Sequence, residues 1–264
     1  MSEREFDYAI HLKLPGNPET PASLGARFVG TLDALTNIDP SIFTNWEIMD
    51  FPAEDSVPLA AARSQIGAMI ERNVDRNQLG EAAPSHGYHA VAFTGNVNKS
   101  RHINLRINAG GKIISGIWLE TGFWRVAADP TIVTYPIFKS ALLAIEAFWP
   151  SAWANAYVRR VGHVAVPIDV AVGGVQPVRI DSPRQVPADP SFPKGFHIPW
   201  LAYLSVKLAA DLKLAPEILT ERTPDGGLLM TATTDRIDPD NPEHLRRARI
   251  LAETMTACTR RSSD

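Results

Sequence analysis

The sequence predicts an α+β fold: a mainly antiparallel sheet with helices packed on one side, as a single large domain or two tightly joined subdomains. Three observations predict it. Short segments of alternating apolar and polar residues are joined by Gly- and Pro-containing turns, as in antiparallel strands. Segments with apolar residues at helical spacing stand between groups of such strands. The regular β-α-β alternation of a doubly wound parallel sheet is missing.

The N-terminal part predicts a strand followed by a helix. Tyr8 to Leu14 alternates in polarity. Thr20 is a suitable N-cap and Pro21 a suitable first residue for the helix, which we expect to end at Asn37. The apolar stripe of this helix consists of Leu24, Phe28, Leu32 and Leu35.

A short strand and a second helix follow. Trp46 to Phe51 is the strand, and the helix is expected from about Pro58 to Asn77, with Gly80 as its stop signal. Its predicted inward-facing residues are Leu59, Ala62, Ile66, Met69, Ile70 and Val74.

The middle of the chain predicts a meander. Its strands are Tyr88 to Thr94, Ile103 to Asn108 and Lys112 to Glu120, and Ala109-Gly110-Gly111 forms the second turn. In the second of these strands the polar residues Asn104, Arg106 and Asn108 alternate with apolar ones, which predicts one solvated face. A third helix near Pro136 to Trp149, with Leu142, Ile145, Ala147 and Phe148 as its buried candidates, precedes strands at Trp153 to Val161 and Val164 to Val172.

Prolines divide the chain into three parts. Residues 1–182 form the N-terminal α+β part, and 183–199 form a Pro-rich connecting loop, because its five prolines exclude a helix or an inner strand. Residues 200–264 are expected to form a helix-hairpin-helix unit that packs into the same domain.

The last unit has the clearest local signals. Pro224-Asp225-Gly226-Gly227 is a turn, and Leu228 to Thr233 favours a strand. Asn241, Pro242 and Glu243 are suited to the cap and first turn of a helix. The apolar stripe of this helix is Leu245, Ala248, Leu251, Ala252 and Met255.

This strand and helix carry a resemblance to a known family. The segment DGGLLMTAT followed by DPDNPEHLRRARIL resembles the C-terminus of the immunity protein 52 family of bacterial polymorphic-toxin systems, of the contact-dependent or type VI kind. Ile38-Asp39-Pro40, Asn45-Trp46-Glu47 and Trp200 to Leu204 are compatible with it, so that the resemblance spans most of the chain. It implies a cognate inhibitor that protects a cell against a toxin, in particular a nuclease of restriction-endonuclease-like fold.

The overall composition restricts the kinds of protein that this chain can be. The chain has 264 residues, of which 45% are hydrophobic and 21% charged, as in an ordinary globular protein. Its net charge of −3 argues against a general nucleic-acid partner. The single cysteine, Cys258, excludes an intramolecular disulfide. Because the N-terminal segment has no apolar core of signal-peptide length and Ser140 to Val158 is interrupted by polar residues and proline, we expect a cytoplasmic protein with no membrane partner.

The sequence offers no catalytic or metal-binding pattern. His86 and His89 begin a strand, and no Cys or acidic ligand lies at metal-site spacing from them. There is no nucleophile elbow, and neither Gly pair fits a phosphate-binding loop. We therefore expect no catalytic residue, no metal and no cofactor.

Two acidic runs are the candidate binding sites. The first contains Trp46, Glu47, Asp50, Phe51, Glu54 and Asp55, and the second contains Asp235, Asp238 and Asp240, with Glu243 beyond it and Arg236 as a partial offset. Opposite charge would steer such runs toward the positive cleft of a nuclease, and aromatic residues beside them would anchor the interface. For both runs the alternative is a solvated loop or helix entry, with Trp46 and Phe51 in the core. The segment Trp118 to Arg125 is a further candidate anchor, and core packing is its alternative.

The function expected from these observations is binding and neutralisation of a toxin by occlusion of its active cleft, without turnover. Two alternatives stay open. One is a small hydrolase or transferase with a site under the Pro-rich loop that uses His163 or His197. The other is an adaptor that loads an effector onto a secretion system.

Overall fold

A computed structural model describes residues 6–261 except 51–54, 78, 97, 113–114, 123–125, 171–177, 186–196, 211 and 213; for 159–170, 178–185 and 259–261 it describes the backbone alone. The strands are β1 (Phe6–Leu14), β2 (Trp46–Asp50), β3 (Asp55–Pro58), β4 (Tyr88–Thr94), β5 (Ile103–Ala109), β6 (Ser115–Thr121), β7 (Trp153–Val170), β8 (Val178–Gln185), β9 (Ile198–Leu204), β10 (Leu219–Arg222) and β11 (Leu228–Thr231). The helices are α1 (Pro21–Ile38), α2 (Leu59–Ala62), α3 (Ile66–Arg72), α4 (Tyr135–Phe148), α5 (Val206–Ala209) and α6 (Pro242–Arg261), with a single 3₁₀ turn at Lys99–Arg101.

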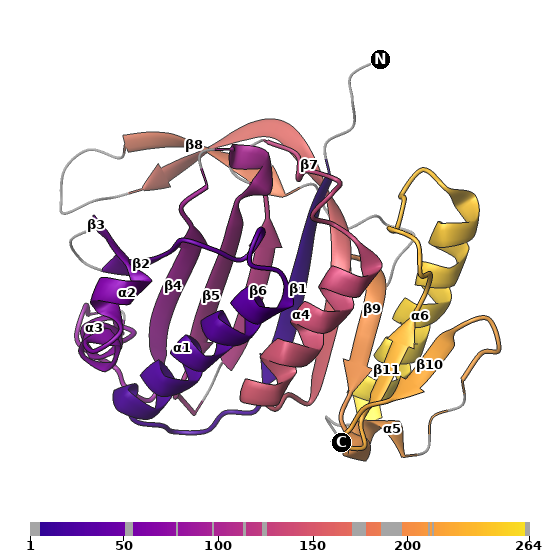
Figure 1. The fold of residues 1–264 in the computed structure, drawn as a ribbon, viewed down its shortest axis with the longest axis horizontal. Helices are drawn as coiled ribbons and strands as arrows, with labels where there is room; N and C mark the ends of the chain where they lie inside the picture. Colours follow the sequence, from indigo (N-terminus) through magenta and orange to yellow (C-terminus); the bar gives the residue numbers. More distant parts are fainter. Residues whose placement is uncertain are drawn as a thin grey trace.

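All strands of the described residues belong to one antiparallel sheet. Its order is β10-β11-β9-β7-β1-β6-β5-β4-β2-β3, and β8 pairs with the distal part of β7 (Figure 1). The predicted α+β class with a mainly antiparallel sheet is confirmed. Strand β1 is central because the C-terminal part of the chain adds to the sheet through β7, so both ends of the sequence share one hydrogen-bonded framework.

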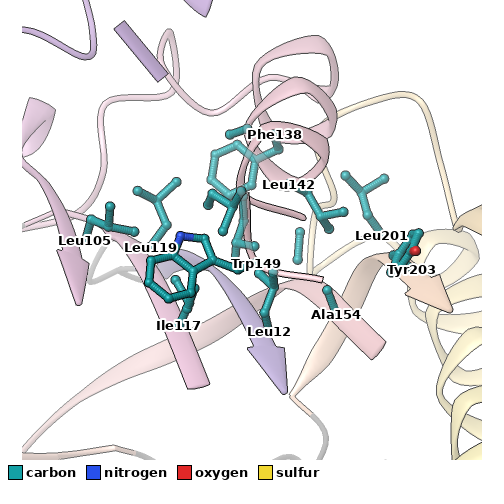
Figure 2. Close-up of a cluster of buried hydrophobic side chains, with 14 of the residues drawn as sticks. Leu12, Leu105, Ile117, Leu119, Phe138, Leu142, Trp149, Ala154, Leu201 and Tyr203 are labelled. Carbon is teal, nitrogen blue, oxygen red and sulfur yellow. The ribbon is translucent and has the colours of Figure 1, made fainter. Parts of the chain in front are cut away.

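Helices α1 and α4 lie side by side across one face of the sheet (Figure 1). Thr20 caps α1 by accepting from the Ser23 amide, and the predicted stripe Leu24, Phe28, Leu32 and Leu35 is fully buried. Figure 2 shows the core that results, in which side chains of α4 meet those of β1, β5, β6, β7 and β9. The buried Trp149 indole donates to Thr31 Oγ1 (2.8 Å), which pairs its only polar group and joins α4 to α1.

The helix expected from Pro58 to Asn77 is wrong in part, because it is two short helices, α2 and α3. Helix α3 packs closely on α1: a Cβ placed on Gly25 would lie 2.7 Å from Ile66 Cγ2. The chain turns at Arg63 to Gln65 to allow this contact. Val74, predicted on the helix, instead bridges to Tyr88 at the start of β4. Tertiary packing here overrides a continuous helical propensity.

Three further expectations need correction. Trp200 to Leu204, expected as the first helix of a helix-hairpin-helix unit, lies in β9, and only the one-turn α5 follows it. Its apolar run reflects burial on both faces of a strand between two neighbours, a pattern that periodicity alone does not separate from a buried helix. The two strands expected at 153–161 and 164–172 are a single strand, β7, and Ala147 is exposed. The expected 183–199 loop lies mostly outside the described residues, with its ends in β8 and β9.

Candidate partner-binding surfaces

The first acidic run lies at one edge of the sheet. Trp46, Glu47 and Asp50 are in β2 and Asp55 begins β3, whereas Phe51 and Glu54 lie outside the described residues. Trp46 is 4% exposed, and its indole donates to Thr36 Oγ1 (3.2 Å). Trp46 therefore belongs to the core.

The carboxylates of this run are partly engaged within the molecule. Asp50 accepts from Arg72 (2.9 Å), and Glu47 accepts from the Ser56 hydroxyl. Asp55 is exposed. The run consequently presents less negative charge than its composition suggests.

The second run forms a firmly held loop between β11 and α6. In this acidic loop (residues 233–241), Asp235, Asp238 and Asp240 are exposed, whereas Ile237 is fully buried. The Tyr8 hydroxyl of β1 donates to the Ile237 carbonyl (3.0 Å). At the start of the loop, the Trp200 indole of β9 donates to the Thr233 carbonyl (2.9 Å). Two strands thus hold the backbone of the loop.

Local hydrogen bonds fix the rest of the acidic loop. The Asp238 amide donates to His244 Nδ1 (3.0 Å), and Asp238 Oδ1 accepts from the Asp240 amide (2.8 Å). Glu243, at the start of α6, binds Arg246 and Arg247, whose hydrogen bonds lower its pKa to about 2. Glu243 is therefore locally neutralised, and the negative charge of this surface comes from the three aspartates, offset in part by the exposed Arg236.

The structure does not bring the two acidic runs together. The acidic loop is attached to β1, and β6, β5 and β4 separate β1 from β2. At about 4.8 Å per strand this is a separation of about 19 Å. The runs are two surfaces.

The Asp-Gly-Gly turn of the C-terminal motif has a structural role. Asp225 accepts from the Tyr203 hydroxyl, Gly226 has a φ of 84°, and a Cβ on Gly227 would lie 2.5 Å from Tyr203 Cε2. Behind Tyr203, Glu146 of α4 is 8% exposed and accepts from the amide (2.8 Å) and hydroxyl (2.6 Å) of Ser151. Burial raises the pKa of Glu146 to about 7 despite these hydrogen bonds. The motif thus packs the hairpin against β9.

The histidines expected for a hydrolase or transferase are not assembled with an acid in a described pocket. His197 stacks on Tyr157 with ring centroids 4.7 Å apart, and only the backbone of His163 is described. Two cavities adjoin α1. One, of about 680 Å³, lies between α1 and α3, and the other, of about 310 Å³, lies beside the connection from β1 to α1; neither is lined by a histidine among the described residues. His89 pairs with Asp75, and the described part of the chain holds no group of three potential metal ligands.

Sequence reasoning missed a surface on the face of the sheet opposite α1 and α4. Arg106, Trp118, His11 and Asn155 lie directly opposite one another on β5, β6, β1 and β7, and Lys13 is paired with Trp153 in the adjacent row. We call these six residues, taken from both rows, the Trp118 row. The signals in the sequence were the solvated face predicted for β5 and the candidate anchor at Trp118; Phe123 to Arg125 of that segment lie outside the described residues.

The side chains of the Trp118 row form a continuous stack. The Arg106 guanidinium lies 5.0 Å from the centroid of the Trp118 ring, and the His11 ring stacks on the same indole at 5.0 Å and 9°. Trp153 meets His11 edge to face at 5.4 Å. Burial, with Lys13, Arg106 and His197 nearby, lowers the pKa of His11 to about 4. His11 is thus neutral at physiological pH, and the cations of the row are Arg106 and Lys13.

Comparison with known proteins identifies no family. No family model matches the sequence, and no curated protein matches it. Among solved structures, a Pseudomonas aeruginosa protein of the type VI secretion system (T6SS) is 12% identical, with a TM-score of 0.49 over 95% of this chain and 72% of that chain. In the part of the chain that is described, no helix has the length and apolar character needed to cross a membrane.

Proposed function

We propose that this protein is an immunity protein that binds a cognate bacterial toxin, specifically a nuclease, and neutralises it by occluding the active cleft without turnover. The observation that carries the proposal is the acidic loop, which holds Asp235, Asp238 and Asp240 exposed on a fixed backbone. The resemblance of the adjoining strand and helix to immunity protein 52 supports the same class.

The anchoring of the loop favours binding. A surface loop with free backbone loses conformational entropy when it binds, and this loss subtracts from affinity. Tyr8, Trp200 and His244 already restrict the acidic loop through hydrogen bonds to its backbone. The loop is therefore preorganised, as expected for a rigid inhibitor.

The charge of the loop supports a nuclease as the target. A nuclease must attract phosphates, so its cleft is positively charged, and carboxylates held at fixed positions would compete for the same cations. Such complementarity accelerates association and makes it depend on salt. Because Glu243 is paired with two arginines, we assign this effect to the three aspartates.

Co-expression tests the proposal. The partner is the protein encoded beside this one, provided it ends in a nuclease-like domain, and we expect this chain to restore growth and to co-elute with that protein. If toxic cells grow no better with this chain and no complex forms on a sizing column, the proposal is wrong. A complex in which the nuclease stays active would instead identify the adaptor.

Charge-removing variants locate the effect. Asp238→Asn keeps an acceptor for the Asp240 amide, and with Asp235→Asn and Asp240→Asn it removes the three negative charges of the loop and leaves Arg236 in place. We expect association with the nuclease to slow by about tenfold at low salt. Asp55→Asn, on β3, and Glu253→Gln, exposed on α6, are matched controls. Slower association of Asp55→Asn alone would move the contact to the first acidic run.

A further inference from the structure

The Trp118 row has a charge opposite to that of the acidic loop. Arg106 and Lys13 are exposed, and the row of Arg106 and the adjacent row of Lys13 contain no acidic residue among the described residues from β4 to β7. One acid, Glu120 of β6, lies on the same face two residues after Trp118, opposite Asn104. Trp118, His11 and Trp153 are half-buried. Trp118 lies opposite Arg106, and Trp153 lies opposite Lys13. The surface therefore combines accessible positive charge with aromatic rings, as the energetically important centres of protein interfaces commonly do.

The row is ordered before any partner binds. Because β5 and β1 flank β6, Arg106 and His11 approach the Trp118 ring from opposite sides. These stacking contacts restrict the rotamers of all three side chains. A partner would therefore lose little affinity to the ordering of side chains.

The row also holds an unsatisfied hydrogen-bond acceptor. Asn155, directly opposite His11, is 4% exposed, and its buried Oδ1 has no hydrogen-bond partner among the described residues; the same holds for Oδ1 of Asn104 and Asn108, on the same face of β5. Buried acceptors are paired in most proteins, by protein, water or ligand. Because these oxygens are buried, they are not themselves contact points for a partner.

We propose that the Trp118 row is a second docking surface, which takes a segment of the toxin that carries Asp or Glu side chains. Its carboxylates pair with Arg106 and Lys13, and its apolar atoms cover the edges of the indoles. This inference rests on the proposed function. A protein segment fits better than single-stranded nucleic acid, because both faces of Trp118 are occupied and no base can stack on that ring.

Charge reversal at exposed positions tests the surface without disturbing the core. The dissociation constant for the purified neighbouring-gene nuclease is measured for wild type, Lys13→Glu and Arg106→Glu, with Lys207→Glu, exposed on α5, as the matched control. We expect each reversal in the row to weaken binding by about tenfold or more, and the control by less than about twofold. Arg106→Lys keeps the charge without the planar group, so its affinity should fall between those of wild type and Arg106→Glu.

The outcomes separate the two proposals. If wild type does not bind the nuclease, the proposed function and this surface both fail. If wild type binds and both row variants bind within twofold of it, only the docking surface is wrong. Tight binding of oligothymidylate by wild type, abolished by Arg106→Glu, would assign the row to nucleic acid. Each variant must have the same thermal unfolding temperature as wild type. A variant that unfolds at a lower temperature is replaced by Lys13→Gln or Arg106→Gln.

Discussion

The buried carboxyl of Glu146 predicts a specific dependence of stability on pH. Its pKa is about 7 in the folded protein, against an ordinary value of 4.5, because burial disfavours the charged form. Between these values the folded state retains the proton while the unfolded state releases it, so stability is fully present below about pH 4.5 and falls as the pH rises to about 7. The difference of about 2.5 pH units corresponds to about 3 kcal/mol.

Replacement of Glu146 by glutamine removes this dependence. The amide oxygen can still accept from the Ser151 amide, and the NH₂ group can donate to the Ser151 hydroxyl, so the local hydrogen bonds are conserved in number. We therefore expect the Glu146→Gln variant to gain about 3 kcal/mol relative to wild type between pH 4.5 and pH 8. Titrating groups that do not interact with Glu146 cancel in the difference, whereas Asp225, whose charge also raises the pKa of Glu146, is coupled to it.

Urea unfolding at half-unit intervals from pH 4.5 to 8.5 measures this difference. The free energy of unfolding is obtained for both proteins by linear extrapolation, after the slopes are shown to agree. Glu253→Gln, at an exposed position on α6, controls for the loss of a carboxyl group in general. A difference between Glu146→Gln and wild type that stays constant across this range would refute the reasoning, since it would mean that Glu146 titrates alike in both states.

Three further predictions follow from single contacts. NMR titration of His11 should give a midpoint near 4, because burial and the charges of Lys13 and Arg106 disfavour the imidazolium; a midpoint near 6.5 would contradict the stacked geometry. Gly227→Ala should lower the free energy of unfolding by about 1–3 kcal/mol, measured in urea, because the new Cβ would overlap the Tyr203 ring; a change below about 0.5 kcal/mol would mean that the turn relaxes freely. A fragment of residues 197–264 should lack cooperative thermal unfolding by circular dichroism, because β9 loses its pairing with β7; a sigmoidal transition would show that the C-terminal unit folds alone.

Local signals in the sequence predicted those elements whose boundaries depend on nearby residues. The cap at Thr20, the stripe of α1 and the start of α6 after Asn241 are all confirmed, since each depends on residues within a few turns. The break between α2 and α3 was not predictable in this way. It depends on a close contact between Gly25 and Ile66, which are far apart in the sequence.

The two candidate surfaces also differ in how far the sequence predicts them. The exposure of Asp235, Asp238 and Asp240 follows from turn and cap residues in a single loop, which the sequence displays directly. The Trp118 row instead depends on register between four strands, since it places Arg106 beside Trp118 and Trp118 beside His11. Alternation in β5 predicted a polar face, but only pairing shows what lies next to it.

Strand β1 supports both surfaces, and the pleat separates them. Tyr8 points toward α4, where it contacts Phe138 and holds the acidic loop at Ile237, whereas His11, an odd number of residues further on, points to the opposite face. A compact domain that covers one surface therefore leaves the other exposed, and a partner that contacts both must extend around the sheet. Since the two sites share no contacts, the effects of Asp238→Asn and Arg106→Glu on binding free energy should add if one extended toxin occupies both. If instead only one of the two changes weakens that complex, the other surface serves a different contact.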